Sequence, residues 1–211
     1  MNKLQKALTH VPPLYSAFNY LNKIRITGTL TVAMLPQDEK RKLILDYAKT
    51  YTCNVFVETG TYKGDTLEAC RSHFKELYSI ELSPELFRGS RDRFVGVQNI
   101  HIYEGNSGEL LPEIVKKINE PALFWLDAHY SGGETAQGPE DSPIVKELDF
   151  LLNYSAFNNC ILIDDARCFN GKSGYPRINV LRRMIEEKNK KDGTVLQLQV
   201  KNDIIRIAKE I

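Results

Sequence analysis

The chain has 211 residues, of which 42% are hydrophobic and 26% charged, as is usual for one soluble globular domain with a sizeable core. Its 28 Lys and Arg residues nearly balance its 27 Asp and Glu residues, giving a formal net charge of +1, and no long basic stripe occurs. We therefore expect no nucleic-acid partner. No run approaches the roughly 20 apolar residues that a bilayer-spanning helix needs, so we also expect no membrane partner.

The cysteines and the N-terminal segment both favour the cytoplasm. Cys53 and Cys160 open apolar strand patterns, which suits buried free thiols in a reducing compartment, and no C-x-x-C pair occurs. The first 28 residues lack the uninterrupted apolar core and the small-residue cleavage site of a signal peptide.

Two regions are predicted. Residues 1–37 form a lead-in that could serve as a lid, as a tail, or as an arm that makes the protein a homodimer. The main domain, 38–211, opens with an amphipathic helix in "QDEKRKLILDYAKTY", for which Asp38 is the expected N-cap.

After this helix, apolar strand patterns alternate with helical patterns, and two strand patterns flank the turn "KND" at the C-terminus. The five alternating strands are "CNVFVE", "LYSIEL", "IHIYEG", "ALFWLDA" and "CILIDDA". This order predicts an α/β, Rossmann-like, doubly wound domain: a mainly parallel seven-stranded sheet with helices on both faces. A closing C-terminal hairpin is expected to add one antiparallel strand at an edge.

Acidic residues stand at four of the five predicted parallel-strand ends, where ligands of such sheets bind. The loop after the first strand reads E-x-G-x-x-x-G from Glu58 through Gly60 to Gly64, which is not the dinucleotide fingerprint G-x-G-x-x-G. An acid there repels phosphate but attracts an ammonium group or a ribose hydroxyl. Glu81, at the end of the next strand, is placed to accept both ribose hydroxyls. S-adenosylmethionine, which joins a nucleoside to an amino acid, fits these requirements.

Five segments taken in order resemble the motifs of class I S-adenosylmethionine-dependent methyltransferases, and they are "ETGTYKGDT", "IELSPELF", "GNSGELLP", "WLDAHY" and "ILIDDAR". The closer similarity is to cation-dependent small-molecule O-methyltransferases of the catechol and caffeoyl-coenzyme A type and to macrocin-type sugar O-methyltransferases. This resemblance implies a methionine pocket at the first motif, a ribose contact at the second and an adenine contact at the third. The implied cofactor-binding residues are Glu58, Gly60, Tyr62, Gly64, Thr66, Glu81, Leu82, Asn106, Ser107 and Asp127.

Within the first motif, Asp65 and Thr66 open a helix whose N-terminus could receive the cofactor carboxylate. Asp65 departs from the aromatic or small residue that the resembled families often carry there.

A metal site is the second implication of the resemblance. Asp127, Asp164 and Asp165 would bind Mg²⁺ or a similar divalent cation, which orients a substrate hydroxyl and lowers its pKa. A plain turn at the strand end is the alternative for the aspartate pair, since many methyltransferases of this fold bind no metal.

His129 is the candidate general base, beside Asp127 on the catalytic edge, because an imidazole titrates near neutrality. Catechol-type enzymes place a lysine near this position, where this sequence has Ala128, His129 and Tyr130. Metal ligation and a pocket-shaping role therefore remain open for His129.

Together these features predict an S-adenosylmethionine-dependent methyltransferase that acts on a hydroxyl of a small molecule or sugar with help from a divalent cation. The alternatives are a metal-independent methyltransferase acting on nitrogen or carbon, and a non-catalytic S-adenosylmethionine-binding protein. A nicotinamide-dependent oxidoreductase would need the tighter glycine spacing. A metal-dependent phosphohydrolase would leave Glu58 and Glu81 without a role.

Overall fold

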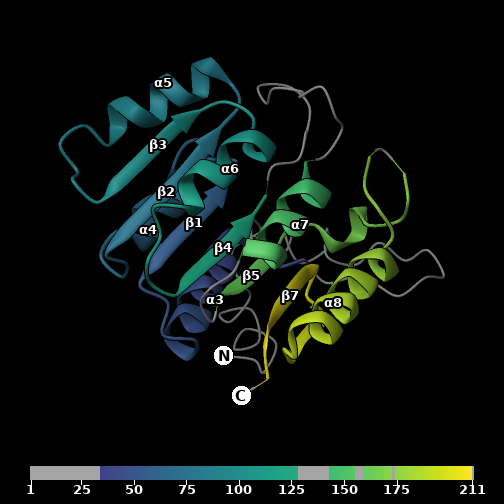
Figure 1. Ribbon diagram of the computed structural model, residues 1–211. Helices are drawn as coiled ribbons and strands as arrows, with labels where there is room; N and C mark the ends of the chain where they lie inside the picture. The colour runs from purple at the N-terminus through teal and green to yellow at the C-terminus, as the bar shows by residue number, and fades with distance from the viewer. Residues whose placement is uncertain (1–33, 128–142, 155–158, 173, 211) are drawn as a thin grey trace, which may run out of the picture.

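The computed structural model describes residues 34–127, 143–154, 159–172 and 174–210. Its centre is a seven-stranded sheet with the order β3-β2-β1-β4-β5-β7-β6 (Figure 1). Strands β1 to β5 are parallel, and β7 runs antiparallel to both β5 and β6. The predicted mainly parallel sheet with a C-terminal hairpin is therefore confirmed. The strands are β1 Val55–Thr59, β2 Glu76–Glu81, β3 Ile100–Glu104, β4 Ala122–Leu126, β5 Cys160–Ile163, β6 Leu196–Lys201 and β7 Ile204–Lys209.

The position of the antiparallel strand differs from the expectation. Strand β7 lies between β5 and β6, so the expectation that an antiparallel strand closes the edge is wrong. The reason lies in the two sequences, because β7 is buried over nearly its whole length whereas β6 is mostly exposed or half-buried. The strand that is apolar on both faces takes the interior place. Asn202 and Asp203 both have positive φ, as a two-residue hairpin turn requires.

Helices cover both faces of the sheet, as predicted. In Figure 1, α6, α7 and α8 lie in front of the strands, and α3 and α4 lie behind them. Two apolar clusters match these layers: Leu111, Leu148 and Leu181 belong to the front one, and Ile44 and Leu67 to the rear one. The helices are α3 Gln37–Thr50, α4 Asp65–Cys70, α5 Pro84–Arg93, α6 Ser107–Val115, α7 Ile144–Tyr154, the 3-10 helix η2 Ala166–Cys168, and α8 Ile178–Asp192.

The start of α3 also differs from the expectation. Pro36 is its N-cap residue, with no side-chain cap, and the Pro36 carbonyl accepts the N–H of Lys40 at 3.0 Å. Asp38 lies within the first turn and accepts a 3.0 Å hydrogen bond from Arg41. The prediction of Asp38 as N-cap is therefore wrong. Residues 1–33 of the lead-in lie outside the described residues, so its role stays a prediction.

Two further expectations concern the cysteines and the membrane. All four cysteines are free, and Cys53, Cys70 and Cys160 are buried. Burial raises the pKa of the Cys53 thiol to about 11, which makes it a poor nucleophile at neutral pH. Within the part of the chain that the structure describes, no helix is long and apolar enough to cross a membrane.

Candidate functional site

The carboxyl ends of β1, β4 and β5 bring three acidic side chains into one row. Leu126 pairs with Ile163 in the register of β4 and β5, so Asp127 and Asp164 follow at the same level. Side chains alternate along a strand, and this alternation turns Glu58, Asp127 and Asp164 toward the face that α3 covers. The charge of Asp127 acts on both neighbours, since it contributes to raising the pKa of Glu58 and that of Asp164. The predicted convergence of acids at one edge is therefore present for these three.

Glu58 is the most deeply buried member of the row, with 1% of its surface exposed. Burial raises its pKa to about 8, with contributions from Asp127 and Glu81, although a hydrogen bond from Ser79 opposes the shift. That bond runs from Ser79 Oγ to Glu58 Oε1 over 2.8 Å, and Thr61 Oγ1 lies 2.5 Å from the same serine oxygen. Glu58 therefore carries a proton near neutral pH and can ionise when a positive group approaches.

The loop after β1 has a conformation that depends on its glycines. Gly60 and Gly64 have φ of 93° and 77°, and Tyr62 has φ of 50°, all in the left-handed region. A Cβ built on Gly64 would lie 2.6 Å from Phe94 Cε2, so no larger residue fits between the loop and α5. Gly64, the N-cap residue of α4, thus lies where the loop backbone packs against the Phe94 ring.

Glu81 fixes this loop from the end of β2. It is buried, and its two carboxylate oxygens accept the backbone N–H groups of Tyr62 at 2.8 Å and Ser83 at 2.9 Å. Each carboxylate oxygen retains a second lone pair after accepting one N–H, so a further donor can still bind. The ribose contact stays a prediction, and the observed geometry leaves acceptor capacity for it.

The residues predicted for adenine lie together after β2 and β3. Asn106 is the N-cap of α6, and its Oδ1 accepts the N–H of Gly108 at 2.8 Å. Ser107 begins the helix and is buried, whereas Leu82 is half-buried. Their contact with adenine stays a prediction.

The start of α4 already carries an ion pair. Asp65 accepts a 2.6 Å contact from Arg93, which lowers the pKa of Asp65, and Thr66 beside it is half-buried. Helix α4 has only six residues. The carboxylate-binding role of Asp65 and Thr66 stays a prediction.

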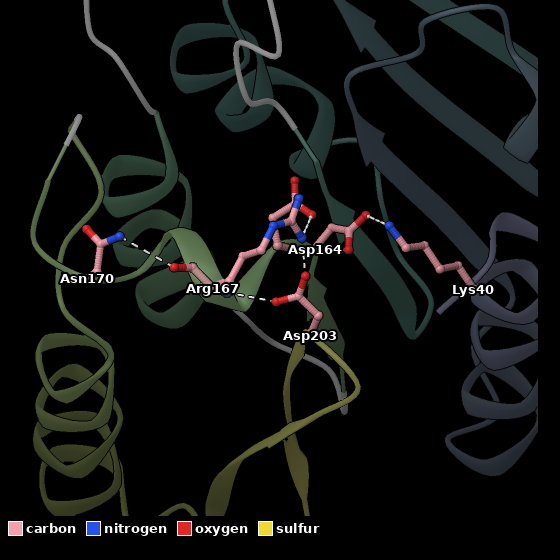
Figure 2. A network of polar contacts seen from close by, with 6 residues as sticks. Lys40, Asp164, Arg167, Asn170 and Asp203 are labelled. Carbon is pink, nitrogen blue, oxygen red and sulfur yellow. Dashed lines mark hydrogen bonds and ion pairs between the residues drawn. The ribbon is translucent and has the colours of Figure 1, made fainter. Parts of the chain in front are cut away.

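The aspartates at the end of β5 form ion pairs with cationic side chains of the protein, and Figure 2 shows the pair of Asp164 with Lys40. Asp164 Oδ2 pairs with the Lys40 ammonium, and Asp164 Oδ1 accepts the N–H of Asp165 at 2.9 Å. Asp165 Oδ1 lies 2.5 Å from Arg167 Nη1, which also contacts Asp203. Burial raises the pKa of Asp164 to about 6, because desolvation and the Asp127 charge outweigh the attraction of Lys40.

In this arrangement the aspartates do not fit the predicted divalent cation. Asp164 and Asp165, two of the three predicted ligands, direct carboxylate oxygens at Lys40 and Arg167. Among the described residues, no group of three or more His, Cys, Asp or Glu side chains is arranged to hold a metal ion. The metal site stays a prediction, and we derive no step of the chemistry from it. His129, Ala128 and Tyr130 lie outside the described residues, so the general base stays a prediction as well.

Lys40 is a residue that the sequence reading missed. It is buried on α3 together with Ile44 and Ala48, and the three are spaced four residues apart. A lysine on the apolar stripe of an amphipathic helix was the available signal, because such a residue needs a buried anionic partner.

Glu147 on α7 was missed for the same reason. It occupies the buried stripe with Ile144 and Leu148 and has 1% of its surface exposed. Burial raises its pKa to about 7, and the hydroxyls of Ser107 and Thr59 oppose the shift. Those hydroxyls are close enough to act on the charge, yet Glu147 Oε1 and Thr59 Oγ1 make no hydrogen bond of normal geometry among the described residues.

No protein-family model matches the sequence, and no curated protein matches it. Solved structures match over nearly the whole chain. The methyltransferase PaMTH1 from Podospora anserina, bound to S-adenosylhomocysteine, is 17% identical, with a TM-score of 0.54 over 100% of this chain and 97% of that one. An O-methyltransferase from Bacillus cereus with the same ligand is 13% identical, with a TM-score of 0.56 over 93% of this chain and 89% of that one. The O-methyltransferase TomG from Streptomyces achromogenes, bound to S-adenosylmethionine, is 13% identical, with a TM-score of 0.57 over 92% and 96%.

At these identities the likeness establishes the fold. The chain has the fold of S-adenosylmethionine-dependent methyltransferases, as the sequence motifs predicted.

Proposed function

We propose that this protein is an S-adenosylmethionine-dependent methyltransferase that methylates a hydroxyl group of a small molecule or sugar. The observation that carries the proposal is the pair of buried glutamates at adjacent strand ends, Glu58 and Glu81, beside a glycine loop. Acids in these positions suit a ligand that presents an ammonium group, a sulfonium charge and a ribose. The fold shared with structures bound to S-adenosylmethionine or S-adenosylhomocysteine supports the same ligand.

The described residues divide the work of binding. Glu58 would give up its proton and face the positive end of the cofactor, while Glu81 would accept ribose hydroxyls in addition to its two backbone N–H groups. Asn106, Ser107 and Leu82 would contact the adenine. The bound cofactor supplies the electrophilic methyl group, and the chain supplies alignment and charge control.

On the acceptor side, Asp127 and His129 are the proposed catalytic residues. Asp127 stands between Glu58 and Asp164 in the acidic row, next to the end of the proposed cofactor pocket. His129 follows two residues later and would take the proton of the acceptor hydroxyl, the role for which an imidazole is suited.

The cellular compartment and the oligomeric state are two further parts of the proposal. The buried free thiols support a reducing compartment, and we propose the cytoplasm. Dimerisation through residues 1–37 remains a proposal that solution scattering would test.

A second candidate follows from Lys40 and Arg167. Because these cations pair with Asp164 and Asp165, a methyltransferase that works without a divalent cation is also supported, and such an enzyme could use a nitrogen or carbon acceptor.

The test is titration calorimetry of the full chain with S-adenosylhomocysteine, followed by methyl transfer from labelled S-adenosylmethionine to a panel of hydroxyl, amine and carbon acceptors. We expect micromolar binding that Glu81→Ala weakens by about a hundredfold, since two or more charge-assisted contacts are lost. The exposed Glu104, at the end of β3, provides the control Glu104→Ala, which should bind normally. Binding without turnover on any acceptor would favour the non-catalytic alternative, and no binding would exclude the proposal.

A further inference from the structure

The row of acids ends at a buried ion pair that joins two distant parts of the chain. Lys40 lies on α3 and Asp164 at the end of β5, 124 residues apart, and their side chains are 8% and 3% exposed. Figure 2 shows the lysine reaching Asp164 from the helix that covers this side of the sheet. An ammonium group in this environment is fixed by its helix and by its partner.

A second cation balances the neighbouring aspartate. Arg167 Nη1 contacts both Asp165, at 2.5 Å, and Asp203, whose side chain is 1% exposed. The backbone N–H of Arg167 also donates to Asp203 Oδ1 at 2.8 Å. These contacts join Arg167 to the turn between β6 and β7. The position of Arg167 therefore depends on both η2 and the C-terminal hairpin (Figure 2).

These contacts compete directly with a divalent cation. A hard cation would need oxygens of Asp164 and Asp165, but Lys40 occupies Oδ2 of Asp164 and a backbone N–H occupies Oδ1. Displacing Lys40 would leave a buried ammonium without its carboxylate, which is costly in a desolvated site. The positive charge at this edge is therefore already provided by the chain.

We propose that Lys40, supported by Arg167, supplies the positive charge at the acceptor end of the site, so that this protein works without a bound divalent cation. This inference rests on the proposed function, which defines the acceptor end of the site. Lys40 is a positioning residue that balances and orients Asp164 beside Asp127, and its ammonium group contacts the Asp164 oxygen that a divalent cation would need.

The contact between Lys40 and Asp164 can be removed by mutation. Lys40→Met keeps the length and apolar stem of the side chain and removes its charge. We expect this variant to bind Mn²⁺, a hard divalent probe, at least about tenfold more tightly than the wild type, because Oδ2 of Asp164 is freed beside Asp127 and carboxylate oxygens are its preferred ligands. The matched control is Lys42→Met, from an exposed lysine on the same helix, which should leave Mn²⁺ binding unchanged.

Mn²⁺ binding to the full chain is measured by electron paramagnetic resonance and by the shift in melting temperature with the metal. Wild-type protein should bind Mn²⁺ only in the millimolar range, and Lys40→Met/Asp164→Asn should lose the site that Lys40→Met gains. Tight Mn²⁺ binding by the wild type that Asp164→Asn abolishes would overturn the proposal. So would a folded Lys40→Met protein that gains no Mn²⁺ site.

If Lys40→Met does not fold, Lys40→Arg gives the alternative test. It keeps the charge, and it should fold and remain indifferent to Mn²⁺ and to chelator; Mn²⁺ binding by this variant would contradict the proposal. Calorimetry with S-adenosylhomocysteine on the same samples separates this inference from the proposed function. If the wild type does not bind S-adenosylhomocysteine, the methyltransferase assignment is rejected. The Mn²⁺ results separately test the role of Lys40.

Discussion

Ser79 Oγ donates a 2.8 Å hydrogen bond to Oε1 of the buried Glu58, between the adjacent strands β1 and β2. The bond stabilises the ionised form of Glu58, whereas burial stabilises the protonated form and prevails, leaving the pKa at about 8. Glu58 therefore holds a proton near neutral pH that a positively charged ligand can expel.

The first prediction is that ligand binding near pH 7 releases this proton. S-adenosylhomocysteine carries an ammonium group, and an ion pair with it would bring the pKa of Glu58 back toward its ordinary value of 4.5. Calorimetry in buffers of different ionisation enthalpy should show close to one proton released per ligand bound. Glu58→Gln should abolish the release and weaken binding, and release that persists in this variant would locate the proton elsewhere.

The second prediction concerns Ser79→Ala. Removing the hydroxyl raises the pKa of Glu58 further above 8, so more of the binding energy goes into ionising it. Below the pKa, affinity for S-adenosylhomocysteine should fall by up to about tenfold per pH unit, and the variant should move the start of this fall to higher pH. Ser72→Ala, at an exposed serine, is the control. Superimposable pH profiles for Ser79→Ala and wild type would show that the bond does not tune Glu58.

The third prediction separates two reasons why a side chain at position 64 is unfavourable: the backbone conformation and the contact with Phe94. Its φ of +77° is unfavourable for a side chain, and an added Cβ would meet Phe94 Cε2 at 2.6 Å. Gly96 has a similar φ of +84° but nothing within 4 Å of an added Cβ. Gly96→Ala should cost about 1 kcal/mol of unfolding free energy from backbone conformation, and Gly64→Ala clearly more, since overpacking adds about 1–3 kcal/mol. Equal losses in denaturant titrations would mean that Phe94 moves aside freely.

The sequence predicted most of the fold because alternating strands and helices leave few topologies, and the motif order restricted them further. The strand-end acids Glu58, Glu81, Asp127 and Asp164 were identified for the same reason, as parallel strands end at one edge. The place of β7 could not be read from strand order alone. It depends on whether β6 or β7 carries the more apolar faces, a comparison that the sequence does allow.

The residues that pair with the strand-end acids could not be predicted from the strand ends alone. Lys40 lies 124 residues from Asp164 along the chain, and their contact depends on how α3 crosses the sheet. Arg167 and Asp203 meet only because the hairpin returns beside η2. The local signal was a charged residue on an otherwise apolar helical stripe, which indicates a buried partner but does not say which one.

The fourth prediction concerns Glu147, the other charged residue on such a stripe. Its pKa is raised from 4.5 to about 7 in the folded protein, so the folded state binds the proton more tightly than the unfolded state. Glu147 therefore lowers stability progressively as pH rises from about 4.5 toward 7, and the full cost remains above that window. Its neighbours Thr59 and Ser107 offer hydroxyls but no opposite charge.

Glu147→Gln removes this titration while keeping the size and polarity of the side chain. The difference in unfolding free energy between variant and wild type should grow in favour of the variant across that pH range, by up to about 3 kcal/mol, at about 1.4 kcal/mol per pKa unit. Glu58 titrates to about 8 in both proteins, so its contribution cancels in the difference. Glu113→Gln, at an exposed glutamate on α6, is the control variant. Denaturant titrations at several pH values decide the matter, because a flat difference for Glu147→Gln would mean that this carboxyl titrates in the folded protein as it does in the unfolded chain.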